Sequence, residues 1–71
     1  MDFTPLAETA LRNRTVMVFI AAGVHTLEEV IALGYLRLKQ LPGVGPTSVA
    51  EVSAMLYHHY GINLTLYPPE G

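Results

Sequence analysis

The run from Leu41 to Val52, Leu-Pro-Gly-Val-Gly-Pro-Thr-Ser-Val-Ala-Glu-Val, constrains the fold of this chain more than any other segment. Gly43 and Gly45 can adopt a positive φ and carry no Cβ, so another backbone can approach them closely. Pro46 suits the first position of a helix, because its φ is already fixed and the amide proton it lacks would have no partner there. The segment therefore predicts a sharp hairpin that leads directly into a helix.

The backbone amides that follow Pro46 form a candidate anion site. Thr47 and Ser48 lie in the first turn, where N–H groups have no helical acceptor and the helix dipole is positive. Such amides commonly hold a phosphate. Val44 is predicted to fill the gap between the flanking helices. The alternative interpretation is an ordinary connection, in which Gly43 ends one helix and Pro46 starts the next.

Length and composition restrict the class of protein. A chain of 71 residues forms one small domain, which buries only about 60% of its unfolded surface and leaves little room for a catalytic cleft. The absence of cysteine excludes a disulfide scaffold and a cysteine-based zinc site or nucleophile. No apolar run reaches the roughly 18 residues that cross a membrane, and the first residues lack a basic secretory segment. We therefore expect a cytoplasmic protein with a single domain over residues 1–66 and a frayed tail over 67–71.

The charge balance argues against strong nucleic-acid binding. The formal net charge is -2 and the pI is near 5.8, so little counterion release is expected. The basic residues lie in the first half and middle of the chain, whereas several acids lie near its ends: Arg12, Arg14, Arg37 and Lys39 against Asp2, Glu8 and Glu70. A weakly positive face is one interpretation, and ordinary solvated surface is the other.

The spacing of helix breakers predicts an all-α fold, a compact domain of four to five helices. After a one-turn lead-in, we expect helices at about 13–22, 27–33, 35–40 and 46–60. Residues 62–66 alternate as a strand would, but no second strand is available to pair with them. We expect an extended segment packed on the bundle.

Local signals refine these helices. Asn13 or Thr15 is a candidate cap for the first helix, which is apolar enough to be buried on most sides. Thr26 and Glu29 have the spacing of a capping box at the second. The expected core is aliphatic and includes Leu6, Leu11, Leu36, Leu38, Leu41, Val49, Val52, Met55 and Leu56.

The hairpin closely resembles the helix-hairpin-helix motif of proteins that bind DNA without sequence specificity. The consensus of that motif is Leu-Pro-Gly-(Ile/Val)-Gly-Pro and then a small residue two positions later, here Ser48. The whole chain resembles the C-terminal domain of the bacterial RNA polymerase α subunit in the order and spacing of four segments: Leu11–Thr15, Gly23–Val30, Pro42–Val52 and Gly61–Leu64. This resemblance implies a fold that contacts the DNA minor groove and activator proteins.

The same resemblance implies a DNA-binding site, position by position. Arg14 matches the arginine that enters the minor groove, and Glu51 matches the glutamate that supports this arginine. Gly45 matches the hairpin glycine, and Ser48 the serine that meets a phosphate. The expected DNA-binding residues are Arg14, Gly43, Val44, Gly45, Thr47, Ser48 and Glu51.

Three positions depart from the family pattern. Met17 stands where the family has an asparagine, and Pro46 and Thr47 stand where it has lysines. The loss of two cations should weaken DNA affinity and flatten its salt dependence. A surface pair of Arg14 with Glu51, and a protein-facing role for Met17, are the competing interpretations of these residues.

Two classes of function therefore stay open. One is a small module that binds double-stranded DNA with low intrinsic sequence specificity, in transcription or its regulation. The other is a protein-interaction module, such as a bacterial or phage regulator, that binds RNA polymerase or a transcription factor.

Neither a cofactor nor a metal is expected, since the adjacent His58 and His59 point about 100° apart on a helix and His25 completes no ligand set. The chain also lacks a nucleophile–base pattern, so we do not expect an enzyme.

Overall fold

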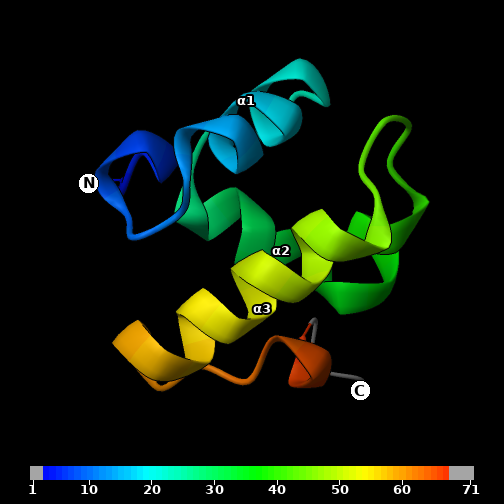
Figure 1. Ribbon diagram of the computed structural model, residues 1–71. Helices are drawn as coiled ribbons and strands as arrows, with labels where there is room; N and C mark the ends of the chain where they lie inside the picture. The colour runs from blue at the N-terminus through cyan, green and yellow to red at the C-terminus, as the bar shows by residue number, and fades with distance from the viewer. Residues whose placement is uncertain (1–2, 68–71) are drawn as a thin grey trace.

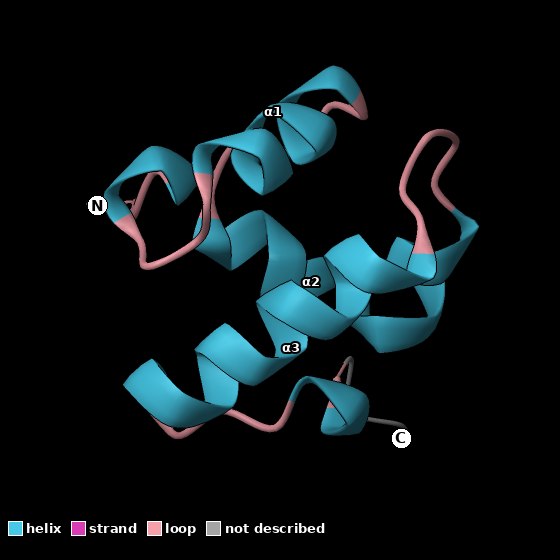
Figure 2. Cartoon of the chain, in the orientation of Figure 1, coloured by secondary structure: helices cyan, strands magenta, loops and turns pink. Residues whose placement is uncertain are grey.

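The computed structural model describes residues 3–67, and over this range the chain folds into helices. They are a short 3-10 helix η1, three α-helices and a second 3-10 helix η2: η1 (Leu6–Glu8), α1 (Asn13–Ala21), α2 (Leu27–Gln40), α3 (Pro46–Tyr60) and η2 (Leu64–Leu66). In Figure 1, η1 and α1 lie on one side of α2 and α3, and η2 returns on the other. The all-α prediction is confirmed for these residues (Figure 2). The predicted frayed tail falls almost entirely on residues 68–71, outside the described range.

Helix α1 presents one apolar face to the core. Val16 and Phe19 are buried, whereas Met17 is 56% and Ile20 37% exposed. Burial on most sides was therefore the wrong expectation. A run of apolar residues fills both faces of a helix, and only the face toward α2 and α3 finds a partner.

The start of α1 has neither of the predicted caps. Its N-cap is Arg12, with no side-chain hydrogen bond to the helix amides. Asn13 is the first helical residue, and the hydroxyl of Thr15 instead donates to Oε1 of Glu51 at 2.8 Å. This contact draws the start of α1 toward α3.

Helix α2 begins with the predicted capping box. The N–H of Glu29 donates to Oγ1 of Thr26 at 3.2 Å, and the N–H of Thr26 donates to Oε1 of Glu29 at 3.0 Å. Beside this box, the N–H of Leu27 donates to the carbonyl of Thr4 at 2.8 Å, and the N–H of Thr4 donates to Glu28 Oε1 at 2.8 Å. The N-terminal segment is thus fixed to the start of α2.

A kink at Gly34 interrupts α2. Gly34 has φ 81° and ψ 169°, a conformation that is essentially restricted to glycine. The range of α2 thus contains two helical segments that meet at Gly34, where the sequence predicts the end of a helix at 27–33 and the start of another at 35–40. Next to the kink, the N–H of Tyr35 donates to the carbonyl of Tyr67 at 3.3 Å. This bond joins the last described residue to the second half of α2.

The core lies between the three α-helices and is closed by η1 and η2. The largest side chains without exposed surface are Leu6, Phe19, Val30, Leu38, Val49, Val52, Leu56 and Leu64. The predicted core is confirmed with one clear exception. Leu36 is 66% exposed, because it lies two residues from the buried Leu38 and so points to the opposite side of the helix.

Residues 62–66 turn instead of running extended. The side chain of Asn63 accepts the N–H of Thr65 at 3.1 Å and starts the 3-10 helix η2. Such an asparagine turn competes with extended backbone. Leu64 is buried as a result, whereas Leu66 is 67% exposed.

Candidate nucleic-acid interface

The connection between α2 and α3 is a tight turn that projects from the body of the protein (Figure 1). The N–H of Val44 donates to the carbonyl of Leu41 at 3.2 Å, and Gly43 between them has φ 81°. Proline at the second position and a positive φ at the third are the pattern of a type II turn. The side chain of Val44 is 8% exposed, so it fills the gap between the helices as predicted. Only its backbone is available to a ligand.

Gly45 differs from Gly43 in its backbone conformation. Its φ of -89° and ψ of 170° are open to any residue, so only one of the two hairpin glycines uses a positive φ. A Cβ added at Gly45 would meet nothing within 4 Å. The internal packing of the protein therefore does not require glycine here, and the bare backbone faces open space.

Helix α3 begins at Pro46, as predicted, with Gly45 as its N-cap. The N–H of Val49 donates to the carbonyl of Gly45 at 3.2 Å and opens the helical ladder. The N–H groups of Thr47 and Ser48 precede this bond and have no helical acceptor. Thr47 is exposed and Ser48 half-buried. The positive start of α3 therefore lies at the surface.

Glu51 holds Arg12 and not Arg14. The Nε and Nη2 groups of Arg12 donate to Glu51 Oε1 at 3.0 and 2.7 Å, and the backbone N–H of Arg12 donates to Oε2 at 3.1 Å. Within residues 3–67, Arg14 forms no ion pair. In residues 3–67, Glu51 therefore neither supports Arg14, as the resemblance implies, nor forms a surface pair with it; the minor-groove contact of Arg14 stays a prediction. Thr15 faces Glu51, and Arg14, one residue away, points about 100° around α1.

These hydrogen bonds lower the pKa of Glu51 to about 2. The largest cause is the side-chain hydrogen bond from Arg12, which outweighs the opposing effect of burial, and the Thr15 hydroxyl adds to it. The carboxylate raises the pKa of Arg12 in turn. Both groups are therefore charged at neutral pH.

We expect the contacts of Glu51 to stabilise the fold at neutral pH and to lose this effect in acid. The folded-state pKa is depressed from 4.5 to about 2, so the contribution is fully present above about pH 4.5 and declines as the pH falls toward 2. Urea unfolding across this range should show wild type and Glu51→Gln converging in free energy of unfolding. A difference that stays constant with pH would contradict this account of the pair.

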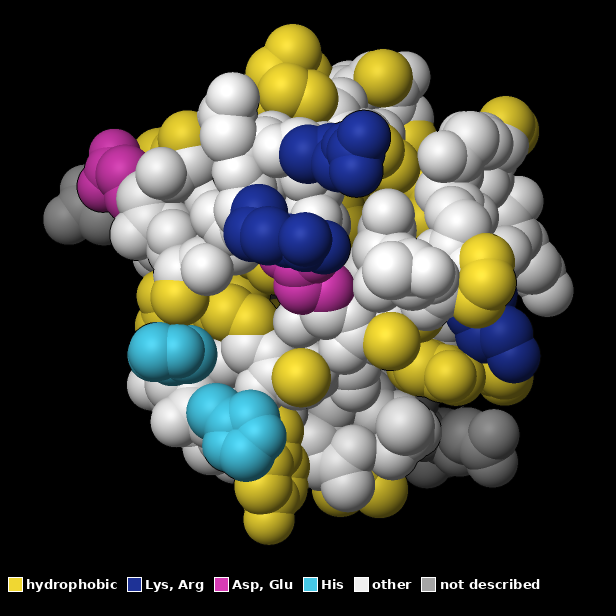
Figure 3. Space-filling model, viewed as in Figure 1, with side chains coloured by type: hydrophobic (Ala, Val, Ile, Leu, Met, Phe, Trp, Pro, Cys, Tyr) yellow, Lys and Arg dark blue, Asp and Glu magenta, His cyan; other side chains and the backbone are white. Residues whose placement is uncertain are grey.

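The ion pair brings Arg12 to the start of α3. Thr47 and Glu51 are four residues apart on α3, so they share one side of the helix. The Arg12 side chain is 68% exposed and that of Glu51 20%. Figure 3 shows basic side chains close together near the middle of this face, with an acidic side chain just below them. We call the surface formed by Arg12, Gly45, Thr47, Ser48 and Glu51 the hairpin face.

Arg14 is exposed on α1, two residues after the N-cap residue Arg12. The predicted site residues are thus divided: the hairpin residues and Glu51 lie in the turn and the first turns of α3, while in the described part of the chain no side-chain hydrogen bond or ion pair joins Arg14 to them. Sequence reasoning missed Arg12. In the sequence it is one more surface cation, and no local signal distinguishes it from Arg14.

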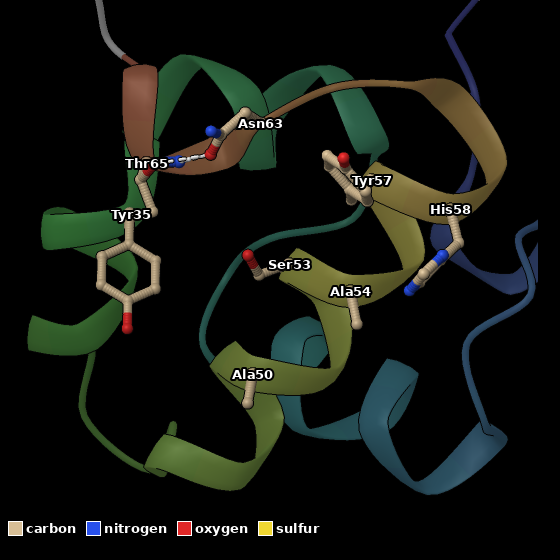
Figure 4. A pocket seen from close by; sticks show the side chains of 8 residues that line it. All are labelled: Tyr35, Ala50, Ser53, Ala54, Tyr57, His58, Asn63 and Thr65. Carbon is tan, nitrogen blue, oxygen red and sulfur yellow. Dashed lines mark hydrogen bonds between the residues drawn. The ribbon is translucent and has the colours of Figure 1, made fainter.

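Exposed aromatic and histidine side chains lie on another part of α3, near its end. Tyr57 and His58 are exposed and their rings meet edge to face, 5.5 Å apart between centroids. They border a pocket of about 430 Å³ lined by Tyr35, Ala50, Ser53, Ala54, Tyr57, His58, Asn63 and Thr65 (Figure 4). The lining contains neither a carboxylate nor a lysine or arginine. In the described part of the chain, no three side chains form a group that suits a metal ion.

No protein-family model and no curated protein matches this chain. Among the described helices, none has the length and apolar character needed to span a bilayer. Function is therefore inferred from the chemistry of the hairpin face.

Proposed function

We propose that this chain is a small module that binds double-stranded DNA with low intrinsic sequence specificity, in transcription or its regulation. In this proposal, the second half of α2, the turn and α3 act as a helix-hairpin-helix motif. The main support is the exposed start of α3, where the amides of Thr47 and Ser48 have no helical acceptor. Backbone amides at a helix start and nearby arginines commonly bind DNA phosphates, and such contacts carry no base specificity.

Each residue of the site has a distinct part in the proposed contact. The N–H groups of Thr47 and Ser48 donate to a phosphate, and the absence of a side chain at Gly45 lets the strand approach. Arg14 reaches the minor groove, where narrow A·T-rich segments concentrate negative potential. Gly43 and Val44 shape the turn and anchor it in the core, and they do not touch DNA through side chains.

The low charge of the chain sets the expected strength of binding. With a net charge of -2, binding should be weak and confined to low ionic strength. Fluorescence anisotropy with a labelled A·T-rich duplex should give a plot of log affinity against log salt with a slope of about -2 to -3, which corresponds to two or three phosphate contacts. Arg14→Ala should reduce affinity and flatten the slope by about 1, more than Arg37→Ala does. Absence of binding at low ionic strength would refute the proposal.

A second candidate function is contact with RNA polymerase or a transcription factor. Met17 and Ile20 are three residues apart on α1 and both exposed, at 56% and 37%, so they form an apolar strip on one side of the helix. Exposed apolar strips of this kind are typical of protein contacts. Loss of a polymerase subunit from pull-downs with Met17→Asp, at unchanged DNA affinity, would favour this function.

A further inference from the structure

The carboxylate of Glu51 binds both the backbone and the side chain of Arg12. Its backbone N–H donates to Glu51 Oε2 at 3.1 Å, and its Nε and Nη2 donate to Oε1 at 3.0 and 2.7 Å. The carboxylate is itself fixed, because the Thr15 hydroxyl donates to the same Oε1 at 2.8 Å. Rotation of the guanidinium away from Glu51 would break two hydrogen bonds. The orientation of this cation is therefore set before any ligand arrives.

The guanidinium nevertheless keeps free donors toward solvent. Two of its N–H groups point to Glu51, while both hydrogens of Nη1 and the second hydrogen of Nη2 remain available. The side chain is 68% exposed. A planar fork with its free edge toward solvent suits a bidentate contact with a phosphate.

The position of Arg12 relative to the start of α3 follows from Glu51. Glu51 lies three residues after Ser48 and four after Thr47, so its carboxylate shares a side of α3 with the side chains of these two residues, one turn from their amides. Arg12 is bound to this carboxylate. A DNA strand seated on those amides would pass beside the guanidinium.

We propose that Arg12 is a further DNA-contacting residue, which binds a backbone phosphate next to the one at the start of α3, and that Glu51 is the residue that positions it. The inference rests on the DNA binding proposed above. A guanidinium already oriented loses less conformational entropy on binding than a mobile one. The Glu51 carboxylate therefore assists DNA binding by orienting Arg12, although its negative charge repels the DNA.

The proposal is testable with a substitution at Glu51, because positioning of Arg12 and simple charge repulsion predict opposite changes in DNA affinity. Glu51→Gln removes one negative charge from the protein. If Glu51 only repels DNA, its loss strengthens binding. If Glu51 positions Arg12, its loss weakens binding. Glu8→Gln is the matched control, since Glu8 is exposed on η1 and the change in charge is the same.

The experiment is fluorescence anisotropy with an A·T-rich duplex at low ionic strength. We expect Glu8→Gln to bind as well as wild type or better, Glu51→Gln to bind about threefold to tenfold more weakly, and Arg12→Ala about tenfold more weakly. In the Arg12→Ala background, Glu51→Gln should cause no further loss, since Glu51 acts through Arg12. Circular dichroism at the same temperature establishes that each variant is folded.

Affinity of Glu51→Gln equal to or above that of Glu8→Gln would overturn the positioning role while leaving the proposed DNA binding in place. Absence of duplex binding by the wild type would overturn both. If Glu51→Gln does not fold, Arg12→Lys decides the question, because it keeps the charge and loses the planar fork. Weaker binding by Arg12→Lys supports the proposal, and wild-type affinity overturns it.

Discussion

Gly45→Asp is expected to lower the affinity for duplex DNA at least tenfold while the protein stays folded. Gly45 is the N-cap of α3 with φ -89°, and a Cβ there meets no atom within 4 Å, so the substitution fits without strain. Aspartate is also a preferred N-cap, whose carboxylate accepts the first helix amides. The new side chain would occupy the Thr47 and Ser48 amides and would repel an approaching phosphate.

Two further variants separate the effect of capping the amides from the effect of the added negative charge. Gly45→Asn caps the same amides without charge and should lose part of the affinity. Ser53→Asp adds the same charge to α3 but lies two residues beyond Glu51, on the opposite side of the helix, and should change affinity little. Anisotropy and thermal unfolding of each variant provide the comparison. Wild-type affinity in Gly45→Asp would remove the hairpin from the site.

Phe19→Ala is expected to cost about 3–5 kcal/mol of folding free energy. Phe19 has no exposed surface and is the largest fully buried side chain, so its removal leaves a cavity at the centre of the domain. A chain of 71 residues has a total stability of roughly 4–11 kcal/mol. The loss is therefore a large fraction of the total, and the midpoint of urea unfolding should fall markedly.

The matched control lies two residues earlier on the same helix. Met17 is 56% exposed, and Met17→Ala should change stability by less than about 0.5 kcal/mol. Urea unfolding followed by circular dichroism measures both variants. Similar losses for Phe19→Ala and Met17→Ala would mean that the face of α1 assigned to the core is wrong.

The turn and the bounds of α3 could be predicted because their signals are local. Pro42 and Gly43 fit a type II turn, Pro46 fits the first helical position, and Gly61 adopts a left-handed conformation at the end of the helix. Each acts through its own backbone preferences. The capping box at Thr26 is of the same kind.

The features that could not be predicted depend on partners distant in sequence. The hydrogen bond from the Tyr35 N–H to the Tyr67 carbonyl, beside the break at Gly34, joins residues far apart in the sequence, and no local pattern predicts it. The choice of Arg12 over Arg14 by Glu51 depends on how α1 is rotated against α3. The sequence does not determine that rotation.

The proposed DNA-binding role of the hairpin face is tested most directly by an amide-shift NMR titration of the labelled protein with a short A·T-rich duplex, at low and at moderate ionic strength. We predict shifts at Gly45, Thr47, Ser48 and the N-terminal turn of α1 that fade as salt is added. Unchanged spectra at low ionic strength, or shifts confined to the Met17 and Ile20 side of α1, would contradict the proposed function.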